Sequence, residues 1–176
     1  MMEHKAFLFD GDRFDEELRP LLEAALSTGN CTPLVHFIHS NLEDLADPFE
    51  GDPLPSDWGS MLEVNDAHAY GDFALTKYYD PTADIGLGAL WGRLQELIAG
   101  DPGVVTSPIL GTTIGPTGSP FDPGKMGSYF QDARQVEANL GRLLALTRQS
   151  SSDVVADAVR MLTQAMRAER GLYVTF

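Results

Sequence analysis

Hydrophobic residues recur at helical spacing in five stretches of the chain. In each stretch apolar side chains return every three or four positions, the period that places them on one face of an α-helix. The stretches expected to be helical are 12–29, 32–47, 85–99, 132–148 and 152–170. Pro20 should kink the first helix or mark its true start, because a proline inside a helix removes a backbone hydrogen bond. Thr32 and Pro33 are typical of the N-cap and first position of the second helix.

Three short segments have the composition of β-strands. They are KAFLF at 5–9, DFALTKYY at 72–79 and LYVTF at 172–176. The C-terminal segment can pair with the N-terminal one or with the middle one to give a small sheet. We therefore expect a single α+β domain over residues 1–176, with about five helices packed against a small sheet that includes both terminal segments.

Two long segments between these elements are rich in glycine and proline. Residues 47–71 and 101–130 nevertheless carry aromatic and aliphatic side chains at short intervals, which is typical of loops packed against a core. One helical turn is expected near 57–62.

Charge is distributed very unevenly along the chain. The formal net charge is −14, and residues 1–80 carry 17 acids against 4 bases, whereas residues 81–176 carry 9 acids and 8 bases. No lysine or arginine lies between Arg19 and Lys77. Such a field repels nucleic acid and anionic membranes and attracts cations or a basic protein. We therefore expect a basic protein partner, and neither nucleic acid nor a membrane.

Neither a secretion signal nor a stretch of roughly 20 apolar residues is apparent, so the cytoplasm is the expected compartment. Cys31 is the only cysteine and precedes the second predicted helix. The helix dipole at that position can lower the pKa of a thiol and produce a reactive thiolate; the alternative is a small buried side chain. The chain has no phosphate-binding loop, no serine-hydrolase motif and no pair of zinc cysteines.

A group of possible metal ligands lies on the second predicted helix. His36, His39 and Glu43 follow one another at spacings of three and four, so they share one helix face, and Asp44 and Asp47 are close by. That face is opposite the apolar stripe, so a solvated polar surface is the competing interpretation. The acidic residues that follow lack the spacing of a calcium-binding loop. No cofactor is expected.

The stretch FDPGKMGSYF at 121–130 brings four functional side chains around a Pro-Gly turn. These are Asp122, Lys125, Ser128 and Tyr129. The aromatic residues predict an anchored structural turn, and the alternative is one wall of a ligand or partner site.

A longer pattern begins at Asp84. It reads Asp-Ile-x-x-x-x-Leu-Trp-x-x-Leu-x-x-Leu-Ile-x-Gly, continues with Pro108-Ile109-Leu110-Gly111 and ends in Tyr129-Phe130 before a helix. Over about residues 84–144 the chain resembles the YfbM-like family of bacterial proteins of unknown function. The resemblance implies a single α+β domain in the bacterial cytoplasm. Some members of such families are suspected of acting as immunity partners in toxin systems.

These observations favour a protein-binding module over an enzyme. The concrete form is an immunity-type inhibitor of a basic partner such as a toxin, with apolar anchors within an acidic surface. The residues expected to form that surface are Glu43, Asp44, Asp47, Phe49, Glu50, Asp52, Asp57 and Trp58. The alternative is a small metal-dependent hydrolase that uses His36, His39 and Glu43 with nearby carboxylates. A self-assembling structural protein is a third possibility.

Overall fold

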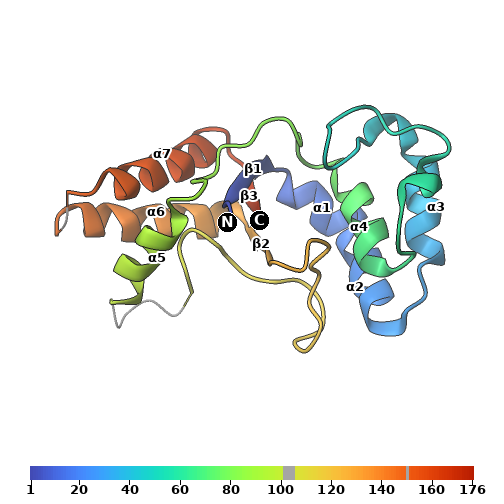
Figure 1. Cartoon of the computed structure of the whole chain (residues 1–176), viewed down its shortest axis with the longest axis horizontal. Coiled ribbons are helices and arrows are strands. Elements are labelled where there is room, and N and C mark those ends of the chain that lie inside the picture. The colour runs from blue at the N-terminus through green and yellow to red at the C-terminus, as the bar shows by residue number, and fades with distance from the viewer. Residues whose placement is uncertain (101–105, 150) are drawn as a thin grey trace.

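A small antiparallel sheet separates two groups of helices (Figure 1). The computed structural model describes residues 1–100, 106–149 and 151–176. The strands are β1 (Lys5–Phe9), β2 (Ser128–Gln131) and β3 (Gly171–Thr175). Their order is β1-β3-β2, so the C-terminal strand lies in the centre and pairs with the N-terminal one, which is one of the two pairings that the sequence allows.

The helices that precede residue 76, which we call the N-terminal layer, lie on one side of the sheet (Figure 1). They are α1 (Gly11–Glu17), α2 (Arg19–Thr28), α3 (Thr32–Ser40) and α4 (Ala67–Leu75). The other face is covered by α5 (Trp91–Ala99), α6 (Ala133–Thr147) and α7 (Asp153–Arg167), which we call the C-terminal layer. The α+β class is confirmed, but the described residues contain seven α-helices where about five are predicted.

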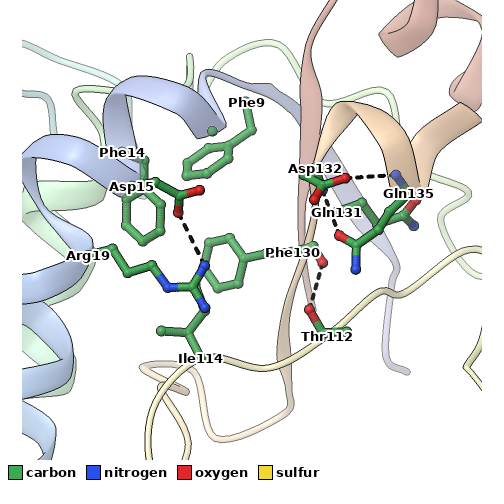
Figure 2. A pocket seen from close by; sticks show the side chains of 11 residues that line it. Phe9, Phe14, Asp15, Arg19, Thr112, Ile114, Phe130, Gln131, Asp132 and Gln135 are labelled. Carbon is green, nitrogen blue, oxygen red and sulfur yellow. Dashed lines mark hydrogen bonds and ion pairs between the residues drawn. The ribbon is translucent and has the colours of Figure 1, made fainter.

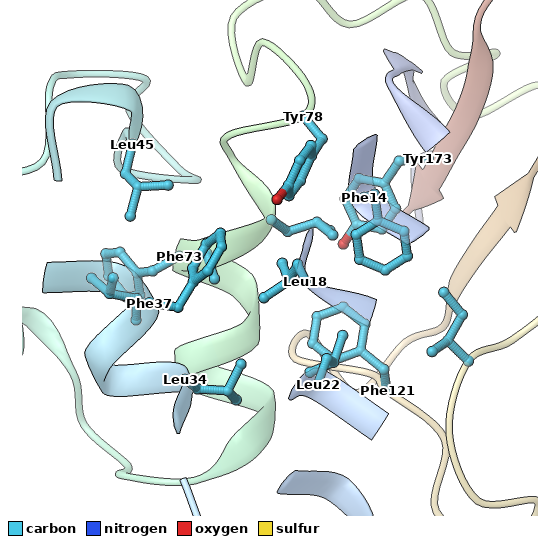
Figure 3. Close-up of a cluster of buried hydrophobic side chains, with 14 of the residues drawn as sticks. Phe14, Leu18, Leu22, Leu34, Phe37, Leu45, Phe73, Tyr78, Phe121 and Tyr173 are labelled. Carbon is cyan, nitrogen blue, oxygen red and sulfur yellow. The ribbon is translucent and has the colours of Figure 1, made fainter. Parts of the chain in front are cut away.

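Aromatic side chains fill the space between the sheet and the N-terminal layer. Alternation along the strands directs Phe7, Tyr173 and Phe130 to this face as one cross-strand row. The ring of Phe130 stacks on that of Tyr173 at 5.1 Å and on that of Phe14 at 5.7 Å between centroids. Figure 3 shows Leu18 between Phe14 and Tyr173 on one side and Phe73 on the other. Complete burial of such a side chain contributes about 1.5–3 kcal/mol.

His4 joins three segments that are far apart in the sequence. Its Nε2 lies 2.7 Å from the carbonyl oxygen of Ile109, and its Nδ1 accepts a hydrogen bond of 3.2 Å from the amide of Leu87. An imidazole that donates at Nε2 and accepts at Nδ1 is neutral. Burial lowers the pKa of His4 because the charged form loses its hydration.

Several predicted boundaries differ from the structure. The first predicted helix is two helices, α1 and α2, and Pro20 lies in the first turn of the second, as one of the two expectations for it states. The second ends at Ser40, not near 47, and the third begins at Trp91, not at 85. Residues 84–88 instead run beside β1, where the amide of Ile85 donates to Ala6 at 2.8 Å.

Two predicted element types are wrong. Segment 72–79 is not a strand: residues 72–75 end α4 and residues 76–79 form turns. Helix α4 begins where the Asp66 carboxylate accepts a hydrogen bond of 2.9 Å from the amide of Ala69. The sequence predicts segment 101–130 to be a packed loop throughout, but its last three residues belong to strand β2, which continues to Gln131. Residues 101–105 of that segment lie outside the described residues. The predicted turn near 57–62 is confirmed as the 3₁₀ turn Trp58–Met61. No helix in the described ranges combines the length and apolar character needed to span a bilayer.

Candidate functional site

Between α3 and α4 the chain forms an exposed acidic segment, residues 43–66. Its backbone is irregular apart from the 3₁₀ turns Leu42–Asp44 and Trp58–Met61. The exposed carboxylates of this segment are Glu43, Asp44, Glu50, Asp52, Asp57 and Glu63. Within the described parts of the chain, none of these six forms an ion pair. Their charge is therefore not compensated locally.

Lys77, the nearest base that follows this segment in the sequence, is engaged inside the fold. Its Nζ donates at 2.8 Å to Oε2 of Glu17 and at 2.8 Å to Oδ1 of Asn41, and only 11% of its side chain is exposed. Hydrogen bonds from Lys77 and then from Tyr78 lower the pKa of Glu17. The ammonium group thus stabilises packing within the N-terminal layer and leaves the acidic segment unneutralised.

The two aromatic residues predicted as anchors lie in opposite environments. Phe49 is 82% exposed. Asp47 supports its turn, because the Asp47 carboxylate accepts a hydrogen bond of 2.8 Å from the amide of Phe49 and its carbonyl accepts one from Gly51. Trp58 is only 3% exposed and packs against Tyr70 and other aromatic rings, so its prediction as a surface anchor is wrong. Aromatic content alone does not indicate which of two loop residues faces solvent.

The predicted metal ligands do not converge on one point. His36, His39 and Glu43 are all exposed, and the ring of His39 lies 5.6 Å from that of Trp58. Over the residues that the structure describes, no three His, Cys, Asp or Glu side chains are arranged to hold a metal ion. The described part of the fold therefore contains no arrangement of side chains that supports the alternative function, a metal-dependent hydrolase.

Cys31 lies immediately before α3, as predicted. Burial, followed by the negative charge of Asp66, raises the pKa of the Cys31 thiol. The side chain is half-buried and packs against the aromatic core. These surroundings favour the second interpretation, a small packed side chain, over a reactive thiolate.

The four side chains predicted around the Pro-Gly turn have separate positions. The backbone amide of Asp122 donates to Nδ1 of His68 at 3.0 Å, and its carboxylate accepts a hydrogen bond of 3.0 Å from Gly127. Lys125 is exposed, whereas Ser128 and Tyr129 are consecutive residues of β2 and so face opposite sides of the sheet. This arrangement matches the structural interpretation of the turn better than a single binding wall.

Asp72 carries a perturbed carboxyl group that no sequence motif marks. Burial, and next the nearby charge of Asp47, raise the pKa of Asp72 to about 7. Burial also raises the pKa of Tyr79 and Tyr173, and the charge of Asp72 contributes to both increases. This carboxyl group therefore lies between the acidic segment and the sheet, where it is poorly hydrated and close to the negative charge of Asp47.

A cavity of about 210 Å³ lies near the sheet, between the start of α6 and the helices α1 and α2. The side chains of Phe9, Phe14 and Phe130 line it (Figure 2). Asp15, Arg19, Asp132 and Gln135 supply charged and polar groups, and the backbone of segment 112–114 lies beside it. The sequence analysis missed this cavity because its residues come from three separate segments, 9–19, 112–114 and 130–135, with no shared motif.

Comparisons of the chain with protein-family models, curated proteins and solved structures found no match. The resemblance to the YfbM-like family accordingly stays a prediction.

Proposed function

We propose that the protein is a binding module that engages a basic protein through its acidic segment, residues 43–66. An immunity-type inhibitor of a basic toxin is the concrete form of this proposal. The observation that carries it is the combination, in one segment, of an almost fully exposed phenylalanine, Phe49, and six exposed carboxylates that form no ion pair with any residue that the structure describes.

Each of these features has a separate physical role in the proposal. Uncompensated carboxylates attract a basic surface over distances of about 8–10 Å at moderate salt and so increase the association rate. Phe49 supplies the apolar contact, since a few large side chains carry most of the affinity of an interface. Its turn is fixed by the Asp47 hydrogen bonds, so little conformational freedom is lost on binding.

Charge reversal tests the electrostatic part. The immobilised protein would capture a partner from an extract of the organism that makes it, and this partner would be purified. Surface plasmon resonance would then measure the rate at which the partner associates with the protein at several salt concentrations. We expect Glu50→Lys with Asp52→Lys to slow association at least about tenfold at low salt. The matched control, Glu96→Lys with Glu137→Lys, makes the same change in net charge on exposed positions of α5 and α6 and should have a much smaller effect.

Truncation of Phe49 tests the apolar part. We expect Phe49→Ala to accelerate dissociation by about tenfold or more and to leave the thermal stability unchanged, because the ring makes little contact within the fold. An association rate that is independent of ionic strength, or equal effects of the two charge-reversed pairs, would contradict the proposal.

A further inference from the structure

The cavity beside the sheet has a rim of mixed charge. Figure 2 shows Asp15 and Arg19 on one side of the Phe130 ring and Asp132 and Gln135 on the other. Groups of both signs therefore face a single small space, although the N-terminal layer as a whole is strongly acidic.

The charged groups of the rim are positioned but not saturated. Arg19 donates from Nε to Glu23 at 3.1 Å and from Nη1 to Asp15 at 3.2 Å. Because a guanidinium carries five N–H donors, Arg19 retains donors beyond the two that it uses within the described residues. Asp15 and Asp132 each use one carboxylate oxygen in the hydrogen bonds found there, to Arg19 and to the amide of Gln135, so each retains an acceptor.

The floor of the cavity is apolar and rigid. Phe9, Phe14 and Phe130 are buried, and the rings of Phe14 and Phe130 lie nearly parallel, 4° apart. Packed rings of this kind hold their shape without a ligand, so an apolar group that enters pays little reorganisation.

We propose that this cavity binds a free α-amino acid with an apolar side chain of about leucine size. The ligand carboxylate pairs with Arg19, its ammonium group pairs with Asp15, and its side chain lies against the small accessible part of the three phenylalanine rings. The site lies outside the acidic segment, and the proposal does not depend on the proposed function.

Other classes of ligand match the cavity less well. Pockets that hold cofactors or drug-sized molecules have volumes of roughly 300–1,000 Å³, which exceeds this one. A simple anion would be repelled by the carboxylates of Asp15 and Asp132. A simple cation would be repelled by the guanidinium of Arg19. A zwitterion satisfies both signs at once.

Three probes with the same apolar body separate these possibilities. L-leucine carries both charges, isopentylamine lacks the carboxylate, and 4-methylpentanoate lacks the ammonium group. In NMR titrations of the full chain we expect saturable shifts of the amides of Thr112, Ile114 and Gln135 with leucine, and binding at least about threefold weaker with either analogue.

Two matched pairs of variants assign the charges. Arg19→Gln should weaken leucine and 4-methylpentanoate but not isopentylamine, whereas Arg13→Gln, which removes an exposed ion pair outside the cavity, should change none of the three. Asp15→Asn should weaken leucine and isopentylamine but not 4-methylpentanoate, with Asp12→Asn as its exposed control. Thermal unfolding verifies that each variant is folded. The absence of saturable leucine binding, or equal binding of leucine and isopentylamine with no effect of Arg19→Gln, would overturn the proposal.

Discussion

Two titratable side chains, Asp72 and His4, lie where the fold disfavours their charged forms, and they act in opposite directions. Burial and the charge of Asp47 raise the pKa of Asp72 from 3.8 to about 7, so Asp72 lowers the stability as pH rises through that interval. Burial lowers the pKa of His4 below 6.5, so His4 lowers the stability as pH falls below 6.5. Below pH 6.5 the two effects oppose each other, whereas between pH 6.5 and 7 only Asp72 changes the stability.

Replacing the Asp72 carboxyl group should remove the stability loss that develops as pH rises from 3.8 to about 7. The pKa shift sets an upper limit of about 4 kcal/mol, and partial exposure to solvent reduces the expected gain to about 1–2 kcal/mol. We expect Asp72→Asn to increase the free energy of unfolding by that amount at pH 8 and to change it little at pH 4.5, where Asp72 in the folded protein is already protonated. Urea denaturation at both pH values measures the difference.

Asp57→Asn is the matched control for this prediction. Asp57 belongs to the same acidic segment but is exposed, so its replacement should alter the stability only slightly at either pH. An equal gain for Asp72→Asn at the two pH values, or a loss at pH 8, would show that burial of this carboxyl group is not what raises its pKa.

At the scale of elements, Lys77 connects three helices. It follows α4, and its ammonium group bonds Glu17 at the end of α1 and Asn41 just after α3. We expect Lys77→Met, which keeps the apolar stem, to reduce the free energy of unfolding by about 1–2 kcal/mol, because Glu17 and Asn41 both lose a charged hydrogen-bond donor. Lys125→Met, the same substitution at an exposed lysine, is the control. If chemical denaturation gives the two variants equal free energies of unfolding, Lys77 does not connect the three helices.

A second prediction concerns the segment that covers the outer edge of β1. A Cβ atom added at Gly86 would lie 2.7 Å from the Cα atom of Lys5 and closer still to the carbonyl oxygen of His4. Because these contacts are with backbone, Gly86→Ala should separate the segment from β1 and cost about 1–3 kcal/mol.

Gly92, in the first turn of α5, provides the control for this glycine. A Cβ atom there meets nothing within 4 Å, so Gly92→Ala should stabilise the protein by about 0.5–1 kcal/mol through helix propensity. Thermal denaturation measures whether each of the two variants is more or less stable than the unsubstituted protein. A neutral Gly86→Ala would mean that residues 84–88 are not held against β1 in solution.

The elements that the sequence predicts best are those with one exposed face. Helices α6 and α7 keep a regular apolar stripe, and their observed bounds differ from the predicted ones by at most three residues at either end. Helix α4 has no exposed residue along its nine positions, so it lacks the polar face on which a helical period depends. The four residues of β2 become a strand by pairing with β3, a contact between distant parts of the chain.

The same reasoning explains which parts of the candidate sites the sequence could predict. Composition alone locates the acidic segment, because charged side chains remain at the surface unless they are paired. Composition does not distinguish the exposed Phe49 from the buried Trp58. The cavity and the environment of Asp72 depend on side chains brought together by tertiary packing, so no local pattern indicates them.

At the scale of the whole molecule, the charge separates along the long axis. The N-terminal layer, with its acidic segment, lies at one end of the molecule in Figure 1, and the almost neutral C-terminal layer lies at the other, with the sheet between them. Repulsion is therefore concentrated in one half of the structure. It opposes packing of α1–α4 much more than packing of α5–α7.

This polarity predicts that salt stabilises the fold. The screening length decreases from roughly 30 Å at 0.01 M salt to about 8 Å at 0.15 M, so repulsion among unpaired carboxylates weakens while the buried contacts are almost unaffected. We expect the free energy of unfolding at pH 7 to rise by about 1–2 kcal/mol over this range. Glu50→Lys with Asp52→Lys should reduce the increase more than Glu96→Lys with Glu137→Lys, because the first pair lies where the repulsion is concentrated. Urea denaturation at the two salt concentrations tests this, and a stability that falls with salt would mean that exposed ion pairs such as Arg19 with Asp15 outweigh the repulsion.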